Sequence, residues 1–443
     1  MATHSTKTVV VLGVAYGGGH VAKLLAAALP RDWRVVAIDR NSHMNHVYVF
    51  PRFVVKPELA PKSFIPYKAV FEPLKETVIK KKNGEAEADV PPTPPRTPPP
   101  PDHHRMLQGL VTRLERNSVT FVKPNAAGTE TIEFDYAVYA LGASLPSPVD
   151  VWGTGGDTRG TKPGGMAWMQ RAGGVMAKAP RILIVGGGAL GIQYATDLKD
   201  MYPDKEVTLL HSRKRVLPIY PEEVHDIVVA RLEALGVKTV LGERVLEWPE
   251  NPFVLDGVEK VVVTNTGAKY AADLVLVCTG PKAHVDVMRG LDARTISPVT
   301  GRIRVLPTTQ VSLAPVAPFE PAAGGISSDG AADALAALSL DGTPLDNIFA
   351  IGDCAQTAAI QAGHTSYFQG EVAARNIARL AKGDEVELED YAPGVPAIKV
   401  TLGLRHWVIA NAEGVTTGED GVDDLLARRM WPLFGAEDCP DDE

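Results

Sequence analysis

Two glycine-rich turns constrain the fold of this 443-residue chain more than any other feature. The first, Gly13–Gly18, lies between the apolar run Thr8–Leu12 and a helical pattern over Val21–Leu29. The second, Gly186–Gly191, follows the apolar run Arg181–Val185 about 170 residues later and also precedes a helical pattern. A strand, a glycine turn and a helix in this order are typical of dinucleotide-binding βαβ units. We therefore predict two such domains in one chain.

Other short apolar runs show no polar alternation, which favours strands buried on both faces of a parallel sheet. They are Arg34–Ile38, Tyr136–Leu141, Glu206–Leu210, Leu274–Cys278 and Ile348–Ile351. The sequence predicts an α/β protein with two Rossmann-like domains and a small C-terminal α+β segment. We assign residues 1–145 and 281–384 to the first domain, 146–280 to the second and 385–443 to the C-terminal segment.

Two segments interrupt this pattern. Residues 80–104 are dominated by proline, and residues 312–344 are rich in Ala, Gly, Pro and Ser. We interpret the first as a solvated loop with polyproline character and the second as another insertion with one helix at Ala331–Leu338. The proline-rich loop is either a tolerated surface insertion or a ligand for a partner protein, with Thr-Pro sites at Thr93 and Thr97.

The first glycine turn carries most of a dinucleotide fingerprint, which has glycines at its first, third and sixth places. Gly13 and Gly18 fill the first and sixth places, but Ala15 stands at the third, where its methyl crowds a pyrophosphate without abolishing binding. The next apolar run ends at Asp39, 21 residues after Gly18, where an acid accepts from ribose hydroxyls. We predict nucleotide binding; the alternative is a tight turn that binds nothing.

The second glycine turn fits the fingerprint at all three places, Gly186, Gly188 and Gly191. The apolar run after it ends at His211, 20 residues past Gly191, where an acid would favour NAD. Two cations follow, Arg213 and Lys214, and they tolerate or favour the 2′-phosphate of NADP. The alternative is that both cations are merely exposed, so the choice of nucleotide stays open.

A third apolar run, Ile348–Ile351, ends in Gly352-Asp353, and a helical pattern follows from about His364 to Leu380. An acid at a strand end beside a helix N-terminus suits a polyol such as a ribityl chain. A capped turn is the alternative reading of this motif by itself. Its position after two glycine turns favours the ribityl interpretation.

Charge and cysteine content exclude several classes. The chain has 45 Lys and Arg against 53 Asp and Glu, a net charge of −8, which argues against sequence-independent nucleic-acid binding. Cys278, Cys354 and Cys439 lie far apart, which argues against a cysteine zinc site, a disulfide scaffold or an adjacent-cysteine redox pair. No metal site is predicted.

Membrane and targeting signals are weak in this sequence. No apolar run approaches the roughly 20 residues of a membrane span, and the N-terminal run lacks the flanks of a signal peptide. Ala2 stands where N-myristoylation requires glycine. We therefore expect a soluble, cytoplasmic protein.

The motifs together resemble a known family. The first glycine turn, Ala140-Leu141-Gly142, the sequence GGGALG at 186–191, Thr279-Gly280 and Ile351-Gly352-Asp353 occur in this order. They look like the flavoprotein reductases with two dinucleotide domains, and the chain is most similar to their apoptosis-inducing-factor-like branch. That branch includes the ferroptosis suppressor proteins and their fungal homologues. The similarity extends over nearly the whole chain except the two insertions.

This resemblance implies FAD in the first domain, NADH or NADPH as electron donor in the second, and a quinone or other small acceptor. Carried over position by position, it implies FAD contacts at Gly13, Ala15, Gly17, Gly18, Asp39, Arg40, Arg52, Val111, Gly142, Gly352 and Asp353. It implies donor contacts at Gly186, Gly188, Leu190, Gly191, Gln193, His211 and Gly280. Arg52 is expected at the pyrophosphate, the backbone of Val111 at the adenine and Asp353 at the ribityl chain.

Three positions depart from the branch. Gln193 stands where the branch usually has a glutamate facing the nicotinamide, and its amide still hydrogen-bonds a carboxamide. His364 stands where ferroptosis suppressor proteins have a lysine, so we assign it as the catalytic proton donor to a reduced acceptor. The alternative for His364 is a satisfied histidine at a helix start. Ala2 replaces the glycine that carries the lipid anchor in that relative.

We expect an FAD-dependent NAD(P)H oxidoreductase of the quinone reductase type. The absence of a cysteine pair excludes electron relay through a disulfide. Two alternatives stay open. One is a redox-sensing flavoprotein with little turnover, which Gln193 and the proline-rich loop favour; the other is an FAD monooxygenase, for whose substrate domain the chain has little room.

An apolar cluster near the C-terminus comprises Leu425, Leu426, Met430, Trp431, Leu433 and Phe434. We expect core packing or a homodimer contact. The alternative is peripheral docking on a membrane surface to reach a lipid quinone. The acidic tail, residues 437–443, opposes contact with anionic lipid.

Overall fold

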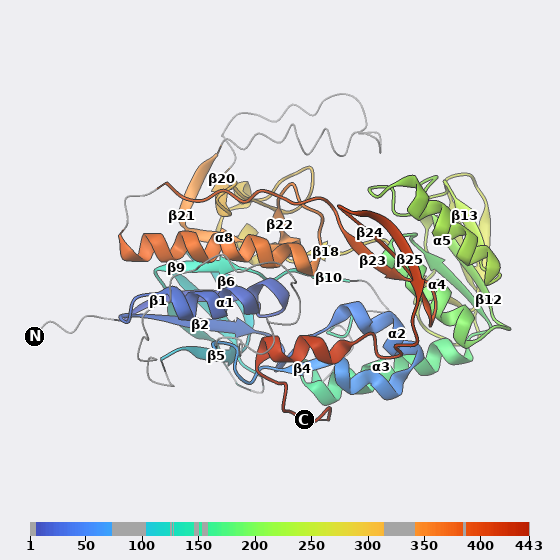
Figure 1. Cartoon of the computed structure of the whole chain (residues 1–443), viewed down its shortest axis with the longest axis horizontal. Coiled ribbons are helices and arrows are strands. Elements are labelled where there is room, and N and C mark those ends of the chain that lie inside the picture. Colours follow the sequence, from blue (N-terminus) through green and yellow to red (C-terminus); the bar gives the residue numbers. More distant parts are fainter. Residues whose placement is uncertain are drawn as a thin grey trace, which may run out of the picture.

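The computed structural model describes residues 6–72, 103–124, 126, 128–145, 150–152, 158–313, 342–383 and 387–442. Two separate parallel sheets lie at opposite ends of the molecule, each with helices packed against it (Figure 1). The prediction of an α/β protein with two Rossmann-like domains is confirmed. The domain boundaries are not tested by this arrangement and stay predictions.

The first domain is built on a six-stranded sheet with strand order β20-β21-β9-β1-β2-β5. All neighbouring pairs are parallel except β20 with β21. The strands are β1 (Lys7–Leu12), β2 (Trp33–Asp39), β5 (Arg105–Gln108), β9 (Tyr136–Tyr139), β20 (Gln310–Leu313) and β21 (Thr343–Ala350). The runs at 8–12, 34–38, 136–141 and 348–351 therefore form strands of one sheet, as their lack of polar alternation predicts.

Alternate residues of β1 enter two different cores. Val9 and Val11 pack with helices α1 (Tyr16–Ala28) and α8 (Gly363–Lys382) on one face of the sheet. Val10 and Leu12 pack on the other face, against the antiparallel strands β6 (Leu110–Leu114), β7 (Ser118–Val122) and β8 (Glu130–Glu133) and helix α6 (Asp286–Leu291). Because side chains alternate across a strand, an all-apolar strand requires both layers.

The second domain repeats this plan with the strand order β13-β12-β11-β17, all parallel. Its strands are β11 (Arg181–Val185), β12 (Glu206–His211), β13 (Lys238–Leu241) and β17 (Leu274–Val277). Helices α3 (Lys162–Lys178), α4 (Ala189–Met201) and α5 (Glu222–Ala234) belong to the core on one face. The antiparallel strands β14 (Val245–Glu247), β15 (Lys260–Thr264) and β16 (Lys269–Ala272) cover the other.

The chain enters and leaves the second domain at one place. Strand β10 (Ala143–Ser144) pairs antiparallel with β18 (Lys282–Ala283), so the two connections run side by side. Helix α2 (Phe50–Val55) of the first half of the chain packs against α3 and α4. The two domains therefore share a packed interface beside a double connection.

Short elements complete the first domain. Strands β3 (His43–Asn45) and β4 (Phe64–Pro66) form one hairpin-like pair, and β19 (Ile303–Arg304) pairs with β22 (Ala355–Gln356). Short 3-10 helices occur at Val47–Val49, Pro57–Ser63, Ala293–Thr295 and Gly352–Cys354.

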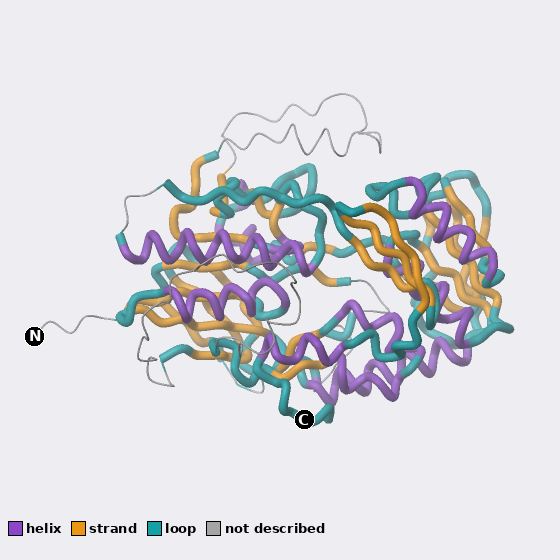
Figure 2. Tube along the Cα trace, viewed as in Figure 1, coloured by secondary structure: helices purple, strands orange, loops and turns teal. Residues whose placement is uncertain are grey.

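The C-terminal segment divides between the two domains. Strands β23 (Ile398–Thr401), β24 (His406–Asn411) and β25 (Gly414–Glu419) form an antiparallel sheet beside α4 and α5 (Figures 1 and 2). The 3-10 helix η8 (Ala427–Phe434) then returns to β4 of the first domain.

Core packing of the C-terminal apolar cluster is confirmed for its largest members. Trp431 is fully buried and Phe434 is 2% exposed, and both pack with Met44 and Ile65. Leu426, in contrast, is 40% exposed. Trp431 and Phe434 are consequently not available to dock on a membrane. No helix in the described part of the chain is both long and apolar enough to cross one.

Both insertions are shorter than the sequence predicts, because residues at their ends belong to the fold. His104 belongs to the fold, because its Nδ1 accepts from the backbone N–H of Val35 at 3.0 Å. Ser312 and Leu313 lie in β20, and Thr343–Pro344 in β21. Pairing between these strand ends extends the sheet beyond the predicted boundary. The predicted helix at 331–338 and the Thr-Pro sites lie outside the described residues.

Candidate functional site: two nucleotide turns and the cleft between them

The first glycine turn connects β1 to α1 in a conformation that requires glycine at two places. Gly13 has φ +89°, and a side chain there would collide with the carbonyl of Ala140. A side chain at Gly18 would collide with the carbonyl of Gly13 itself. Ala15 is the residue directly before α1, in extended conformation. The turn is therefore closed tightly under the start of the helix, whose free amides favour an anionic group.

Asp39 lies at the end of β2 and holds the first turn in place. Its Oδ2 accepts from the N–H of Val14 at 2.7 Å, and its Oδ1 accepts from the N–H of Asn41 at 2.8 Å. Burial raises the pKa of this carboxyl, and the amides of Val14 and Asn41 and the adjacent Arg40 oppose that shift. The guanidinium of Arg40 stacks over Trp152 at 4.6 Å. Asp39 and Arg40 thus lie together at the carboxyl end of the sheet, where nucleotides bind in such folds.

The second glycine turn repeats the first one in detail. A side chain at Gly186 would collide with the carbonyl of Cys278, and one at Gly191 with the carbonyl of Gly186. Gly188 precedes α4, and no atom lies within 4 Å of the place where its side chain would start, so the approach to the helix start is open. His211 replaces the acid: its Nδ1 accepts from the N–H of Gly187 at 3.1 Å. This turn fits a pyrophosphate on its open side.

The Gly-Asp motif, Gly352-Asp353, lies between the end of β21 and the start of α8. Gly352 has φ +75°, and its N–H donates to Oε1 of Gln369 in α8 at 2.7 Å. The backbone carbonyl of Asp353 accepts from Nε of Arg302 at 3.1 Å. Burial raises the pKa of the Asp353 carboxyl, and Arg302 opposes that shift. Asp353 is partly buried just before α8, and its assignment to the ribityl chain stays a prediction.

Gly142 and Gly280 mark the two connections between the domains. Both have positive φ, +64° and +109°, and neither has an atom within 4 Å of the place where a side chain would start. The carbonyl of Gly142 accepts from the N–H of His284 at 2.9 Å. The two glycines leave open space beside each domain's sheet.

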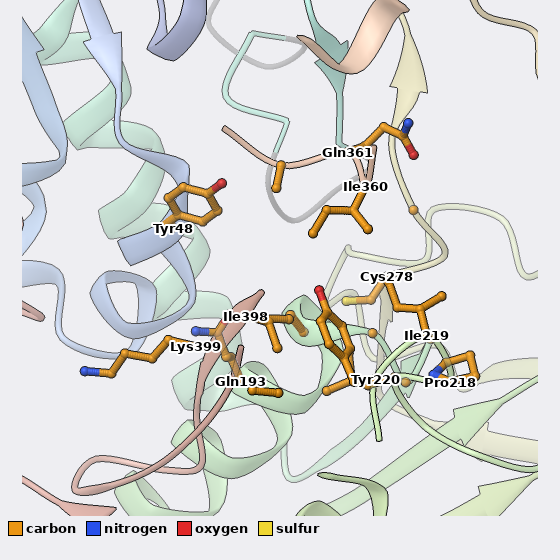
Figure 3. A pocket seen from close by; sticks show the side chains of 18 of the residues that line it. Tyr48, Gln193, Pro218, Ile219, Tyr220, Cys278, Ile360, Gln361, Ile398 and Lys399 are labelled. Carbon is orange, nitrogen blue, oxygen red and sulfur yellow. The ribbon is translucent and has the colours of Figure 1, made fainter. Parts of the chain in front are cut away.

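One large cleft of about 2240 Å³ joins the two halves of this site. Its lining includes Gly186–Gly188 and His211 of the second domain, and Tyr48 and His364 of the first. Across the open space in Figure 3, Tyr48 and Ile360 lie opposite Tyr220 and Ile398. Small-molecule pockets usually measure roughly 300–1,000 Å³, so this cleft has room for more than one ligand.

Two polar side chains of this cleft, Gln193 and Tyr48, are held by neighbours. Nε2 of Gln193 donates to Oγ1 of Thr401 in β23 at 3.1 Å, which leaves its carbonyl oxygen as an acceptor. The hydroxyl of Tyr48 accepts from the N–H of Gly363 at the start of α8 at 2.5 Å. His364 lies next to that contact with an exposed side chain, and partial burial lowers its pKa.

Tyr48 and its neighbours were not predicted from the sequence. The hydroxyl of Tyr16 lies 3.0 Å from Nδ1 of His46, and the rings of Tyr16 and Tyr48 are 5.2 Å apart. Burial lowers the pKa of His46 to about 4, so the imidazole is neutral at pH 7. The sequence signal that could have pointed to them is the run His46-Val47-Tyr48, which places two polar rings soon after Asp39, the acid of the first nucleotide motif.

Arg52 has a different environment from the one expected. Its guanidinium is 1% exposed and makes a bidentate ion pair with Asp197 of α4, with both N–O distances 3.0 Å. It also donates to the carbonyl of Gly403 at 2.7 Å. The structure thus gives Arg52 a contact between α2 and α4, and its predicted contact with a pyrophosphate stays a prediction.

Three further residues predicted to contact a nucleotide lie at a helix crossing, in the core or in a helix. A side chain at Gly17 would lie 2.7 Å from Cβ of Ser366, so this glycine permits α1 and α8 to cross closely. Val111 lies in β6, 7% exposed, in the core under the first sheet. Leu190 lies in the first turn of α4 and is partly buried. Contacts of these three with a cofactor stay predictions.

The described residues contain no group of three or more His, Cys, Asp or Glu side chains placed to hold a metal ion. The three cysteines are unpaired. Cys354 is fully buried, and burial raises its pKa to about 12. A thiol in that state is a poor nucleophile, so packing accounts for this residue.

Comparison with known proteins identifies the family. A family model described as pyridine nucleotide-disulphide oxidoreductase matches residues 7–314. Fe-regulated protein 8 of Mycosarcoma maydis is 33% identical over 98% of this chain and 96% of its own length. Human ferroptosis suppressor protein 1 is 25% identical over 90% of this chain and 87% of its own length.

A solved structure gives the same fold. NDH2 from Plasmodium falciparum, in complex with NADH, aligns with a TM-score of 0.65 over 98% of this chain and 97% of its own, at 11% identity. The two glycine turns and Asp39 lie at the carboxyl ends of parallel strands, the edge at which open α/β sheets bind ligands. The chain belongs to the pyridine nucleotide-disulphide oxidoreductase family, in its apoptosis-inducing-factor-like branch, with FAD as cofactor and NADH or NADPH as the second nucleotide.

Proposed function

We propose that this protein passes electrons from NAD(P)H through FAD to a quinone or a similar flat, small acceptor. The cleft that joins the two domains is the observation that carries this proposal, because its volume exceeds the need of one ligand. One end offers the glycine turn of the second domain, and the other offers Tyr48, Ile360 and His364. Bound flavin supplies the two-electron and one-electron chemistry; the chain positions the ligands and excludes water.

The cysteines support direct reduction of a small acceptor. Relatives that relay electrons through a disulfide need two adjacent thiols, and this sequence has only Cys278, Cys354 and Cys439. All three are free, and Cys278 and Cys354 are buried. Electrons therefore leave the site on a molecule that enters the cleft itself.

The lining of the cleft suits an aromatic ring with polar oxygens. Ile360 and Ile398 offer apolar contact area, and Tyr220 offers an aromatic face. The Tyr48 oxygen accepts from Gly363, which leaves the phenolic proton for a ligand oxygen. We assign Tyr48 to orient the acceptor.

His364 remains our proposed proton donor. Its side chain lies at the cleft, one residue past the Gly363 amide that meets Tyr48. Because burial lowers the pKa of His364, most of its imidazole is neutral at pH 7. Only the protonated fraction is able to donate a proton to a reduced acceptor. Acceptor reduction should therefore speed up as the pH falls toward 6.

Steady-state turnover with a water-soluble quinone tests the proposal. We expect oxidation of NADH or NADPH that depends on both the quinone and bound FAD. His364→Gln should lower the rate of flavin reoxidation by quinone by tenfold or more, on the order of the gain from one general acid. It should leave the rate of flavin bleaching by the donor unchanged, which single-turnover absorbance measures separately.

Two outcomes would count against the proposal. A protein with full flavin occupancy that fails to turn over with any quinone would favour the redox-sensing alternative. Oxygen consumption that depends on an organic substrate would favour a monooxygenase. A cytoplasmic location and a homodimer both stay predictions that cell fractionation and light scattering address.

A further inference from the structure

We propose that the second nucleotide site selects NADPH over NADH, because His211 removes the acceptor for a ribose 2′-hydroxyl while Arg213, Lys214 and Arg244 supply cations for a 2′-phosphate. The inference rests on the proposed use of a nicotinamide donor and names which donor it is. Four observations carry it: the equivalence of two positions, the placement of both imidazole nitrogens, the nearby cations and the fate of the one nearby acid.

His211 occupies in the second domain the position that Asp39 occupies in the first. The N–H of Gly13 donates to the carbonyl of Ile38, and the N–H of Gly186 donates to the carbonyl of Leu210, both at 2.8 Å. The residue after each carbonyl then accepts from the turn: Asp39 from Val14, and His211 from Gly187. The two sites are therefore in register with each other.

A carboxylate at this position has lone pairs to spare after it accepts from the turn. Asp39 has two oxygens with about four acceptor sites, so a ribose hydroxyl is still able to donate to it. His211 has one acceptor nitrogen in its neutral form, and Gly187 takes it. A 2′-hydroxyl of NADH consequently has no acceptor on this side chain.

The other nitrogen of His211 offers no acceptor to a ligand either. Because Nδ1 accepts, the proton resides on Nε2, which is buried and has no hydrogen-bond partner among the described residues. The side chain as a whole is 7% exposed, and burial together with Arg213 lowers its pKa. His211 is thereby fixed as a neutral support for the turn that neither accepts from nor repels a ligand.

Cations are gathered at the same end of the cleft. Arg213, Lys214 and Arg244 all line it with exposed side chains. In the part of the chain that the structure describes, none of the three forms an ion pair with a carboxylate. Three cations without an ion-pair partner favour a dianionic phosphate more than a neutral hydroxyl.

Glu243 is the acid that lines this end of the cleft, and it is engaged elsewhere. Its Oε2 accepts from the hydroxyls of Thr264 at 2.7 Å and Thr266 at 3.1 Å, and its Oε1 accepts from Tyr270 at 3.0 Å. These hydroxyl bonds lower the pKa of the carboxyl. Glu243 is thus held toward strands β15 and β16 instead of serving as an acceptor for the ribose.

Binding of two nucleotide fragments tests the inference without turnover. We would titrate the FAD-loaded protein with adenosine 2′,5′-bisphosphate and with 5′-AMP by calorimetry. The bisphosphate should bind at least about tenfold more tightly, the minimum expected of one hydrogen bond to a charged group. Arg213→Ala and Lys214→Ala should each lower the affinity for the bisphosphate several-fold and the affinity for 5′-AMP less. Lys269→Ala, an exposed cation of β16 outside the cleft, is the matched control and should change neither.

The variant His211→Asp provides the reciprocal test. Aspartate at this position should still accept from Gly187, as Asp39 does from Val14, so the turn keeps its support. It should weaken the bisphosphate by about tenfold or more and shift kcat/KM toward NADH. Flavin content and the unfolding midpoint of each variant show whether it is folded.

Equal affinity for the two fragments, or a kcat/KM with NADH that matches or exceeds that with NADPH, would overturn the inference. Tight bisphosphate binding without turnover of either donor would leave the inference standing and defeat the proposed function. A preference for NADPH that persists in both Arg213→Ala and Lys214→Ala would show that these two cations do not cause it, which would also contradict the inference.

Discussion

Arg52 and Asp197 form a bidentate ion pair across the interface between α2 and α4, with both partners 1% exposed or less. The pair joins segments 145 residues apart in sequence. Removal of one partner leaves a buried charge without a counter-charge, whereas removal of both partners does not. Arg52→Met should therefore destabilise the protein by about 3–5 kcal/mol, and Arg52→Met with Asp197→Leu by much less.

Chemical denaturation of the two single variants and the double variant measures this relationship. A coupling free energy close to zero in that cycle would show that the ion pair acts as two independent polar groups. The same set of variants should retain FAD if Arg52 serves the interface and not the pyrophosphate.

Two adjacent glycines of α3 should respond to alanine in opposite directions. A side chain at Gly173 would collide with the carbonyl of Val54 in α2, but nothing lies within 4 Å of the same position at Gly174. Gly173→Ala should destabilise the protein by about 1–3 kcal/mol. Gly174→Ala should stabilise it by about 0.5–1 kcal/mol, because alanine is the better helix former. Thermal melts of both variants test the pair, and the same sign for both would contradict this interface geometry.

Trp431 should be the C-terminal residue on which the stability of the first domain depends most. It is fully buried, and its Nε1 donates to the carbonyl of Lys62 at 3.1 Å. Trp431→Ala should cost about 3–5 kcal/mol. Arg429→Ala, an exposed position in the same 3-10 helix, should stay within about 0.5 kcal/mol of the parent in urea unfolding. Equal effects of the two substitutions would mean that η8 is only loosely docked.

Stability should fall in mild acid because of His43. This side chain is 2% exposed, and burial lowers its pKa to about 3 from an ordinary value of 6.5. The unfolded chain therefore binds the proton first, and folding loses free energy as the pH drops from about 6.5 toward 3. At pH 5 this linkage amounts to about 2 kcal/mol relative to pH 8.

His43→Gln isolates that contribution, since glutamine hydrogen-bonds but does not titrate. We expect the variant to lose about 2 kcal/mol less than the parent between pH 8 and pH 5. Urea unfolding at both pH values gives the comparison. Parallel losses in both proteins would assign the acid sensitivity to other groups, such as His46 or His104, whose pKa values burial also lowers to about 4.

Asp39 should control retention of FAD. Its carboxylate accepts from the amide of Val14 in the first glycine turn, where we predict that FAD binds. Asp39→Ala removes the acceptor, and we expect a loss of FAD affinity of roughly 10- to 100-fold, as for a hydrogen bond to a charged group. Asp39→Asn keeps one acceptor oxygen and should lose less. The ratio of flavin to protein absorbance after dialysis reports both.

Local sequence was sufficient for the nucleotide turns. A glycine is required at Gly13 and Gly186 by a positive φ and by a backbone carbonyl from the neighbouring strand, so a short motif with fixed spacing carries the information. The apolar strands were predictable for the same reason, since burial on both faces leaves a continuous apolar run. The third-place alanine, Ala15, did not prevent the turn from forming.

Side-chain partners distant in sequence were not predictable in this way. Arg52 meets Asp197 only because α2 and α4 pack together, and no spacing rule connects them. Tyr48 reaches the amide of Gly363 because a 3-10 turn and the start of α8, 315 residues apart, border one cleft. The expected pyrophosphate contact of Arg52 rests on resemblance alone, and the ion pair with Asp197 is visible only in the packed interface.

The sequence by itself determined the two dinucleotide folds, the family and the absence of a thiol relay, because these depend on local glycine geometry and on which residue types are present. Only the tertiary structure decided that Trp431 is core, that Arg52 belongs to a domain interface and that Nδ1 of His211 supports the second glycine turn. Those outcomes depend on which surfaces meet, and burial at a contact between distant segments leaves no signature in a local window of sequence.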